Sequence, residues 1–187
     1  CGCLAAMLRY STNTKERYAT VEKELEYLER YIFLLKSRYE HRLEVEVDCE
    51  ESVKQEQLPK IVLQQLVENS IQHGYNNSKN IMKIYVHGWR DETGWYFEVR
   101  DNGQGTTEEV REELNEKMRK IREKIMSRGS SIEFEIGGMG LANTYARMFL
   151  VYNGRAVFRI RNLEEGLSVI IGVSEKEDEA DVSGDGC

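Results

Sequence analysis

The chain has 187 residues and a formal net charge of -7, with 40% hydrophobic and 32% charged residues. This length and balance suit one packed domain with some additional structure. The negative charge argues against a nucleic-acid backbone or an anionic membrane surface as the main partner, so a phosphate site would have to be built locally. The cysteines at 1, 3, 49 and 187 form no C-x-x-C pair and have no histidine at a zinc-like spacing, which argues against a structural metal.

The sequence contains neither a signal peptide nor a long apolar segment, which indicates a soluble chain from a reducing compartment. It begins with Cys1, in the middle of an apolar pattern. We therefore expect a fragment of a longer protein, whose missing part could include a membrane anchor.

The N-terminal part predicts helices. Residues 4–17 have the pattern of the end of a helix, and Thr20 is typical of the N-cap of a second one. In this second run an apolar stripe occupies one side and glutamates the other, which indicates helix packing, with a dimer seam as the alternative. The stripe comprises Val21, Leu25, Leu28, Ile32 and Leu35, and the glutamates are Glu22, Glu24, Glu26 and Glu29.

The middle of the chain predicts strands around one helix. Residues 43–48 alternate strictly, which is typical of a strand with one solvated face. Pro59 introduces a predicted helix over 60–74, which Gly74 ends. Residues 81–89 and 94–101 predict two strands joined by a polar turn.

The C-terminal part predicts two further helices and a hairpin. Residues 106–131 are highly charged, with many i,i+4 pairs, and a glycine-rich turn leads into a second helix that ends near 152. Residues 155–162 and 167–173 predict a hairpin. The tail after 174 is acidic and poor in apolar residues, which predicts disorder.

Three stretches contain residue types that suit a phosphorylated ligand. The helix over 60–74 carries Glu68, Asn69 and His73, of which the last two are four residues apart and share a face. Taken alone, these residues could equally form a polar outer face that ends at a glycine cap.

The second stretch is Asp101 with Gly103 and Gly105 at a strand end, although Asn-Gly is also a strong hairpin-turn signal. The third is the glycine-rich run over 137–140, whose backbone N–H groups at a helix start could hold phosphates. Its spacing fits neither a P-loop nor a Rossmann unit.

The order of these stretches resembles the histidine-kinase branch of the Bergerat-fold ATPases, a superfamily that also contains gyrase, heat-shock-90 chaperones and mismatch-repair MutL. "LVENSIQHG" is similar to the N box, "DNGQG" to the G1 box and "GGMGLAN" to the G2 box. The flanking "LRYS", "YLERYIFLLKSRYEHRL", "LP" and "LQQLVEN" resemble LytS-like two-component sensor kinases. The resemblance covers roughly residues 4–174.

This resemblance implies an α+β fold: a two-layer α/β sandwich with a mixed, mainly antiparallel sheet, helices on one face and an N-terminal helical extension. It implies a helical segment over 1–40 from the end of the dimerisation region and its linking helix. A catalytic domain would follow over 41–174, with an ATP lid at about 104–137, and an acidic disordered tail over 175–187.

The resemblance also implies ATP and Mg²⁺ as ligands. Asp101 would accept a hydrogen bond from the adenine amine, while Gly103 and Gly105 would let the backbone approach the base and hinge the lid. Asn69 would bind Mg²⁺ through its side-chain oxygen. The phosphates would be held by backbone amides around Gly138, Met139, Gly140 and Leu141.

Glu68 is the candidate general base that would help to activate the attacking histidine, with a charge that tunes the metal as the alternative. His73 is assigned to a phosphate or helix-end contact.

Three positions depart from the family pattern. Gln72 stands where many relatives carry lysine, so Lys79, Lys83 or Arg147 could supply the phosphate-binding cation instead. Gln65 replaces a common proline, which we expect to be harmless. Leu167 follows Gly166 where a threonine often closes the site.

None of the histidines, at 41, 73 and 87, lies in a segment like the acceptor helix of these kinases, which would fall upstream of Cys1. We therefore expect ATP binding without autophosphorylation on histidine. Full-length relatives are homodimers, usually membrane-anchored bacterial sensors with this portion in the cytoplasm, and pass the phosphoryl group to a response-regulator aspartate. The alternatives are an ATPase clamp of the gyrase or heat-shock-90 type, and a degenerate non-catalytic module for dimerisation or interaction.

Overall fold

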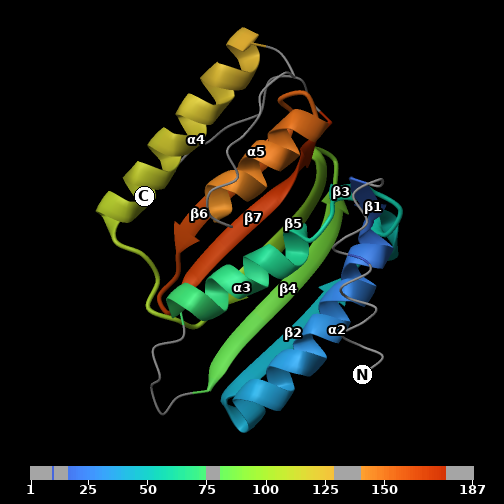
Figure 1. The fold of residues 1–187 in the computed structure, drawn as a ribbon, viewed down its shortest axis with the longest axis vertical. Helices are drawn as coiled ribbons and strands as arrows, with labels where there is room; N and C mark the ends of the chain where they lie inside the picture. The colour runs from blue at the N-terminus through green and yellow to red at the C-terminus, as the bar shows by residue number, and fades with distance from the viewer. Residues whose placement is uncertain (1–9, 11–16, 75–80, 129–139, 176–187) are drawn as a thin grey trace.

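A computed structural model describes residue 10 and residues 17–74, 81–128 and 140–175 (Figure 1). Apart from Tyr10 and from Arg17, which is not helical, the helix expected over 4–17 lies outside the described residues, as does the tail beyond Glu175. Gly138 and Met139 of the glycine-rich turn also lie outside them. None of the helices among the described residues combines the length and the apolar character that a membrane crossing needs.

A five-stranded sheet forms one layer of the fold. Its order is β2-β4-β5-β7-β6, with β2 and β4 parallel and all other neighbours antiparallel. The mixed, mainly antiparallel sheet of the prediction is confirmed. The strands are β2 (Leu43–Cys49), β4 (Met82–Asp91), β5 (Gly94–Asp101), β6 (Ala156–Asn162) and β7 (Leu167–Ser174).

Helices form the second layer. In Figure 1, α2, α3 and α5 lie over one face of the sheet, and α4 lies beside α5. The bounds are α2 (Val21–Tyr39), α3 (Val62–Gly74), α4 (Glu108–Arg128) and α5 (Leu141–Val151). This arrangement confirms the two-layer sandwich with helices on one face.

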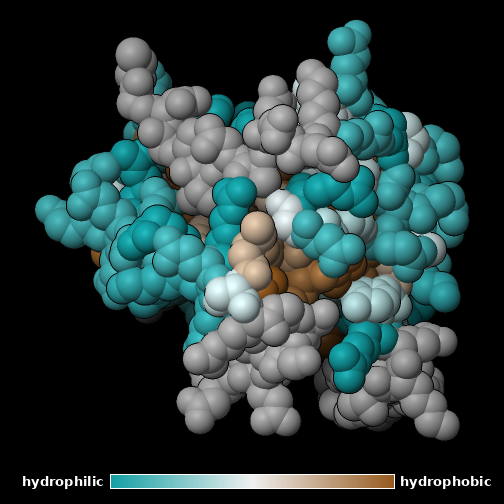
Figure 2. Space-filling view, turned by 90° about the horizontal axis from the view of Figure 1, so that it is seen from above, coloured by the Kyte–Doolittle hydropathy of each residue, from teal (hydrophilic) through white to brown (hydrophobic). Residues whose placement is uncertain are grey.

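The core lies between the layers, because alternate residues of β4 face the helices and meet the apolar side of α3. Met82, Ile84 and Val86 are buried from the sheet side, as are Leu63 and Leu66 from α3. Seen from one end, hydrophilic residues surround a hydrophobic area in the middle of the view (Figure 2), as expected for a core enclosed between two layers.

The other face of the sheet carries a row of aromatic rings. Tyr85, His87 and Trp89 alternate along β4 and stack on one another, with neighbouring ring centroids 5.9 and 5.4 Å apart, and Tyr96 of β5 continues the row. The histidine ring also contacts Asp48 of β2, with 3.1 Å between Nδ1 and Oδ2. These contacts account for the polar and aromatic residues that alternate with the buried ones in β4.

Helix α2 begins as expected at the N-cap Thr20, whose hydroxyl accepts from the backbone N–H of Lys23 at 3.4 Å. The apolar stripe packs into the core, with Leu25 only partly buried. The expectation that Glu24 lies on the exposed side is wrong, because its side chain is 1% exposed. Its Oε1 accepts from the Tyr10 hydroxyl at 2.5 Å and from the N–H of Ile61 at 2.7 Å.

Two short strands were not predicted. β1 (Tyr18–Thr20) and β3 (Gln57–Pro59) pair antiparallel and connect the start of α2 to the chain before α3. Each is too short to show an alternating pattern in the sequence. Pro59 therefore ends a strand, and α3 begins three residues later, after Ile61 with a φ of 70°. Single 3₁₀ turns over Glu40–Arg42 (η1) and Glu51–Val53 (η2) flank β2.

Candidate functional site

A cavity of about 430 Å³ lies where α3, α4, the end of β5 and the start of α5 meet. It brings together the three stretches that the sequence analysis singled out. From them, Asn69, His73, Asp101, Gly105, Gly140 and Leu141 line the cavity. The hairpin alternative for "DNGQG" is wrong, because the chain leaves β5 at Asp101 and continues into α4.

Asp101 is the most enclosed acidic group of this cavity, with 7% of its surface exposed. Its Oδ1 accepts from the N–H of Gly103 at 2.9 Å, and hydrogen bonds also reach the carboxyl from the Ser70 hydroxyl and the backbone of Leu167. Burial raises the pKa of the Asp101 carboxyl above its usual value, and these hydrogen bonds offset part of that rise. The result is a fixed hydrogen-bond acceptor on the cavity wall.

Gly103 is required by close backbone packing. A Cβ there would lie 2.4 Å from the Cα of Gly74, so the last residue of α3 and the chain after β5 touch backbone to backbone. This contact sets the position of Asp101 relative to α3. The expected approach of Gly103 to a base remains a prediction.

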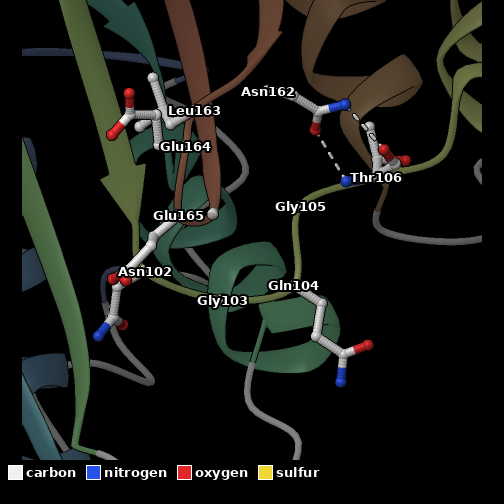
Figure 3. Close-up of a pocket in the computed structure, with 10 residues that line it drawn as sticks. Asn102, Gly103, Gln104, Gly105, Thr106, Asn162, Leu163, Glu164 and Glu165 are labelled. Atoms are coloured by element: carbon white, nitrogen blue, oxygen red, sulfur yellow. Dashed lines mark hydrogen bonds between the residues drawn. The ribbon is translucent and has the colours of Figure 1, made fainter.

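Gly105 lies where the chain turns from the sheet toward α4. Its φ of 69° falls in the left-handed region, which glycine adopts without steric cost. Directly after it, Thr106 is held to β6 by two hydrogen bonds, from its N–H to Asn162 Oδ1 at 2.9 Å and from Asn162 Nδ2 to its carbonyl at 2.8 Å. Figure 3 shows this pair and the Gln104 side chain directed away from it.

A second hollow of about 490 Å³ adjoins the first through Gly105 and Thr106 (Figure 3). The chain after Asp101 forms one side of it, and the β6–β7 connection forms the other. Within that connection, a Cβ on Gly166 would lie 1.8 Å from the carbonyl oxygen of Asp101. Gly166 therefore lets the hairpin pack directly on the end of β5.

Asn69 is buried on the side of α3 that faces the cavity. Its Nδ2 donates to the carbonyl of Gln65 at 2.9 Å, which orients the amide, and no described residue donates to its Oδ1. That oxygen is the kind of ligand that Mg²⁺ prefers. No group of three or more acidic, histidine or cysteine side chains within the described ranges could hold a metal ion. The residues therefore fit a Mg²⁺ that is bound through one protein oxygen together with phosphate oxygens.

Glu68 does not line the cavity. It lies one position around α3 from Asn69, and its Oε1 accepts from Gln72 Nε2 at 3.2 Å. Its charge also acts on Tyr31 of α2. The pKa of Tyr31 is raised to about 12, first by burial of the side chain and then by the negative charge of Glu68. His73, in contrast, lines the cavity and is exposed.

The start of α5 provides backbone donors at the cavity. Gly140 is the N-cap and has no side chain with which to cap the helix, and no atom of the described residues lies within 4 Å of the position where its Cβ would be. Gly140 and Leu141 thus present the positive end of a helix dipole beside open space.

The sequence analysis expected a lid over about 104–137 but named none of the residues with which α4 lines the cavity. Val110, Leu114 and the paired Lys117 and Glu113, with 3.0 Å between Nζ and Oε1, line it from that side. The sequence does show apolar residues among the charged residues of α4. Their spacing alone does not indicate which part of the fold they contact. Ile160, Leu167 and Val169 of the β6–β7 hairpin add an apolar wall.

Of the three candidate cations, two lie among the described residues, and neither of these lines the cavity. Lys83 is directed toward Glu44 of β2, with 3.7 Å between Nζ and Oε2, and Arg147 donates to Gln65 and to the carbonyl of Lys60. Lys79 lies outside the described residues. Among the residues described, Lys117 is the one lysine or arginine that lines the cavity.

Two protein families match the sequence. The family described as "Histidine kinase-, DNA gyrase B-, and HSP90-like ATPase" matches residues 54–177, and the family described as "Histidine kinase" matches residues 1–43. The first match contains every residue described above as lining the cavity.

Curated relatives include sensor proteins of the LytS type. The chain is 32% identical over 163 residues to Sensor protein LytS of Enterococcus faecalis, which covers 86% of this chain and 26% of that protein. It is 36% identical over 94 residues to Sensor protein LytS of Bacillus cereus, which covers 50% of this chain and 16% of that protein. The chain thus spans about a quarter or less of the length of these relatives.

Solved structures support the same fold. The catalytic domain of histidine kinase ThkA, in a nucleotide-free form, superposes with a TM-score of 0.56 at 16% identity, covering 84% of this chain and 94% of that one. The family match covers most of the chain, and residues of the N box, G1 box and G2 box meet at one cavity. Sequence, fold and site geometry therefore agree on the same family. The chain belongs to the histidine kinase-, DNA gyrase B- and HSP90-like ATPase family, as an ATP-binding domain of the histidine-kinase type.

Proposed function

We propose that this chain is the catalytic domain of a two-component sensor histidine kinase. It binds ATP and transfers the γ-phosphoryl group to a histidine outside residues 1–187, from which it passes to an aspartate of a response regulator. The observation that carries the proposal is the single cavity lined by Asn69, Asp101 and the start of α5. The similarity to LytS sensor proteins supports the kinase assignment within the wider ATPase family.

Adenine recognition is assigned to Asp101. Its buried carboxylate accepts a hydrogen bond from the exocyclic amine of adenine, whereas guanine presents a carbonyl at that place and is repelled. The hydrogen bonds from Gly103 and Ser70 hold the acceptor in position before the base arrives, which lowers the cost of ordering it on binding. The apolar residues Ile160, Leu167 and Val169 suit the faces of a base.

The phosphates are assigned to the other end of the cavity. The N–H groups at Gly140 and Leu141 donate to phosphate oxygens, and we assign Gly138 and Met139 to the same cradle. Asn69 supplies its Oδ1 to Mg²⁺. When bound, Mg²⁺ neutralises phosphate charge and orients the γ-phosphoryl group. His73 and Lys117 line the cavity and are assigned to phosphate contacts, Lys117 in place of the lysine that Gln72 replaces.

Glu68 is proposed as the general base for the attacking histidine. It lies on the α2 side of Asn69, outside the cavity, which suits a group that meets a histidine from another segment better than one that binds nucleotide. The alternative is that its charge tunes the metal site. A Glu68→Gln variant that binds Mg²⁺ and ADP normally but no longer phosphorylates an acceptor-histidine segment supplied separately would favour the base.

The remaining expectations concern the whole protein. We propose that the region over 1–40 belongs to the dimerisation part of a homodimer, that 41–174 is the catalytic domain with its lid at about 104–137, and that 175–187 is a disordered tail. The domain would face the cytoplasm, and only segments outside this chain would reach the membrane.

The test is a calorimetric titration of ADP with and without Mg²⁺ on the wild-type chain and Asp101→Asn. We expect binding that strengthens with Mg²⁺ and weakens in the variant by about 2 kcal/mol or more, roughly thirty-fold, because an amide N–H then faces the adenine amine. Glu46→Gln is the matched control, since it removes an exposed carboxylate of β2 outside the cavity. A folded wild-type chain that binds no ADP would contradict the proposal and favour an interaction module. Rapid ATP turnover without any phosphoacceptor would favour an ATPase clamp.

A further inference from the structure

We propose that Gln65 is a positioning residue that fixes Asn69 relative to the start of α5, and thereby sets the Mg²⁺-dependent part of nucleotide affinity. This inference rests on the proposed function. The sequence analysis expected the glutamine at this position, where proline is common, to be harmless. The structure instead gives both its backbone and its side chain a specific partner.

Gln65 connects the two sides of the cavity through short contacts. Its backbone carbonyl accepts from Asn69 Nδ2 at 2.9 Å. Its side-chain Oε1 accepts from Thr144 Oγ1 at 3.1 Å and from Arg147 Nη1 at 3.2 Å, both on α5. Thr144 lies one turn into α5, and its N–H donates to the carbonyl of Gly140 at 3.2 Å. Through Gln65 and Thr144, hydrogen bonds therefore connect Asn69 on α3 to the N-cap Gly140 of α5.

The donors on α5 lie in places where a lost hydrogen bond is not easily replaced. Thr144 is 0% exposed, and Arg147 is partly buried and also donates to the carbonyl of Lys60 just before α3. A buried hydroxyl that loses its acceptor cannot recover the bond from water, so the Thr144 hydroxyl depends on the oxygen at this place, whereas Arg147 keeps the Lys60 carbonyl as a second acceptor. The Oε1 of Gln65 serves as acceptor for both donors. The spacing of α3 and α5 is thus defined by hydrogen bonds in addition to apolar packing.

This spacing matters for the metal more than for the base. Mg²⁺ has to reach Asn69 Oδ1 on α3 and phosphate oxygens held at the start of α5 at the same time, and its octahedral geometry tolerates little error. Adenine is bound by Asp101, which takes its own hydrogen bonds from Gly103, Ser70 and Leu167 and none from this path. Loss of the Gln65 contacts should therefore reduce the gain in affinity from Mg²⁺ and leave Mg²⁺-free binding nearly unchanged.

The experiment compares Gln65→Met, Gln65→Glu and Gln64→Met by ADP calorimetry in EDTA and in saturating Mg²⁺. For Gln65→Met we expect the Mg²⁺-dependent gain to fall by about tenfold, the range seen when residues that orient a metal ligand are removed, with less than about a twofold change in EDTA. Gln65→Glu keeps an acceptor for both donors and should restore most of the gain. Gln64→Met is the matched control, because the Oε1 of Gln64 is buried without a partner among the described residues.

The outcomes separate a positioning role from a merely structural one. A folded Gln65→Met chain that retains the full Mg²⁺ gain would overturn the inference, as would equal losses with and without Mg²⁺. If Gln65→Met does not fold, Thr144→Val provides the same test, since it removes one of the two donors at constant shape and should lower the gain by about threefold. A wild-type chain that binds no ADP at all would overturn the proposed function itself.

Discussion

The two sides of the cavity are held in place by different kinds of contact. On the side of α3 and β5, Asp101 and Asn69 are buried, and the Asp101 carboxyl accepts hydrogen bonds from Ser70 of α3 and Leu167 of β7, which are separate elements of the fold. On the side of α4, the ion pairs connect residues three or four apart within the helix itself. They join Arg111 to Glu108, Lys117 to Glu113, Arg119 to Glu116 and Glu123, and Lys120 to Glu116.

This difference indicates which side of the cavity is already in place before nucleotide binds. Local ion pairs stabilise a helix without fixing where it lies, and exposed pairs contribute little to overall stability. Met118 is the one fully buried side chain among the described residues of α4, and the helix is anchored at its start by the contacts of Thr106 with Asn162. We therefore infer a rigid side at α3 and β5 and an α4 side that adjusts its position when nucleotide binds.

The largest effect should come from Met118→Ala. Loss of a fully buried methionine side chain costs about 3 kcal/mol, and here the loss falls on the contact of α4 with the rest of the fold. We expect proteolysis within α4 to accelerate strongly, while unfolding of the sheet, followed by fluorescence of the buried Trp95, changes much less. Equal losses by both probes would show that α4 belongs to the same cooperative unit as the sheet.

The next effect is the pH dependence of adenosine binding, which has no phosphate to titrate. The ionised form of Asp101 is the better acceptor for the adenine amine, so affinity should fall as the pH falls through the pKa of this carboxyl. Burial raises that pKa, so the decline should begin at a higher pH than for an exposed aspartate and approach tenfold per pH unit below it. Calorimetry over the range in which circular dichroism shows a folded chain measures it. Affinity independent of pH would argue against Asp101 as the acceptor.

A smaller effect is expected for Gly105→Ala at the junction between the two sides. A side chain there meets a φ of 69° and places its Cβ 2.9 Å from Asn162 Oδ1, at a cost of about 1–2 kcal/mol. We expect the chain to relieve this strain by releasing Thr106 from β6, which should weaken ADP binding with little change in thermal stability. Gly154→Ala, which has a φ of 89° outside the cavity, is the control for backbone strain alone. Equal ADP affinities of the two variants would show that the backbone at Gly105 has no specific role in nucleotide binding.

The smallest effect is expected for Arg119→Ala on the exposed side of α4. Hydrogen bonds from Arg119, and then from Lys120, lower the pKa of Glu116 to about 2. Since water and salt screen an ion pair whose two side chains are both about half exposed, we expect overall stability to stay nearly unchanged and ADP affinity to change by less than about twofold. The pKa of Glu116, followed by NMR, should rise toward its usual value. A large loss of stability would mean that the ion pairs fix the position of α4 after all.

Much of the fold was predictable because its elements are strongly periodic. β2, β4 and β5 alternate, α3 carries a continuous apolar face, and the glycine-rich run marks the start of α5. The pair of β1 and β3 was not predictable, since three-residue strands exist only through their partner. Glu24 was misplaced for the same reason, because its backbone partner Ile61 lies 37 residues away.

The candidate site was predictable in its members more than in its construction. The motif order indicated that Asn69, Asp101 and Gly140 belong together, and the structure places all three at one cavity. The contact of Gly103 with Gly74 and the bonds of Gln65 to α5 depend on how elements pack, which no local pattern reports. Likewise, Lys117 lines the cavity only because of the way α4 is oriented relative to the rest of the fold.

The most direct test of the central claim is amide hydrogen exchange with and without Mg²⁺ and ADP. If the α3 and β5 side is preformed and α4 adjusts, amides of β5 and of the middle of α3 should be well protected in both states. Amides over Glu108–Arg128 should gain protection only when nucleotide is present. Equal protection of α4 in both states, or a gain confined to β5 and α3, would contradict the account.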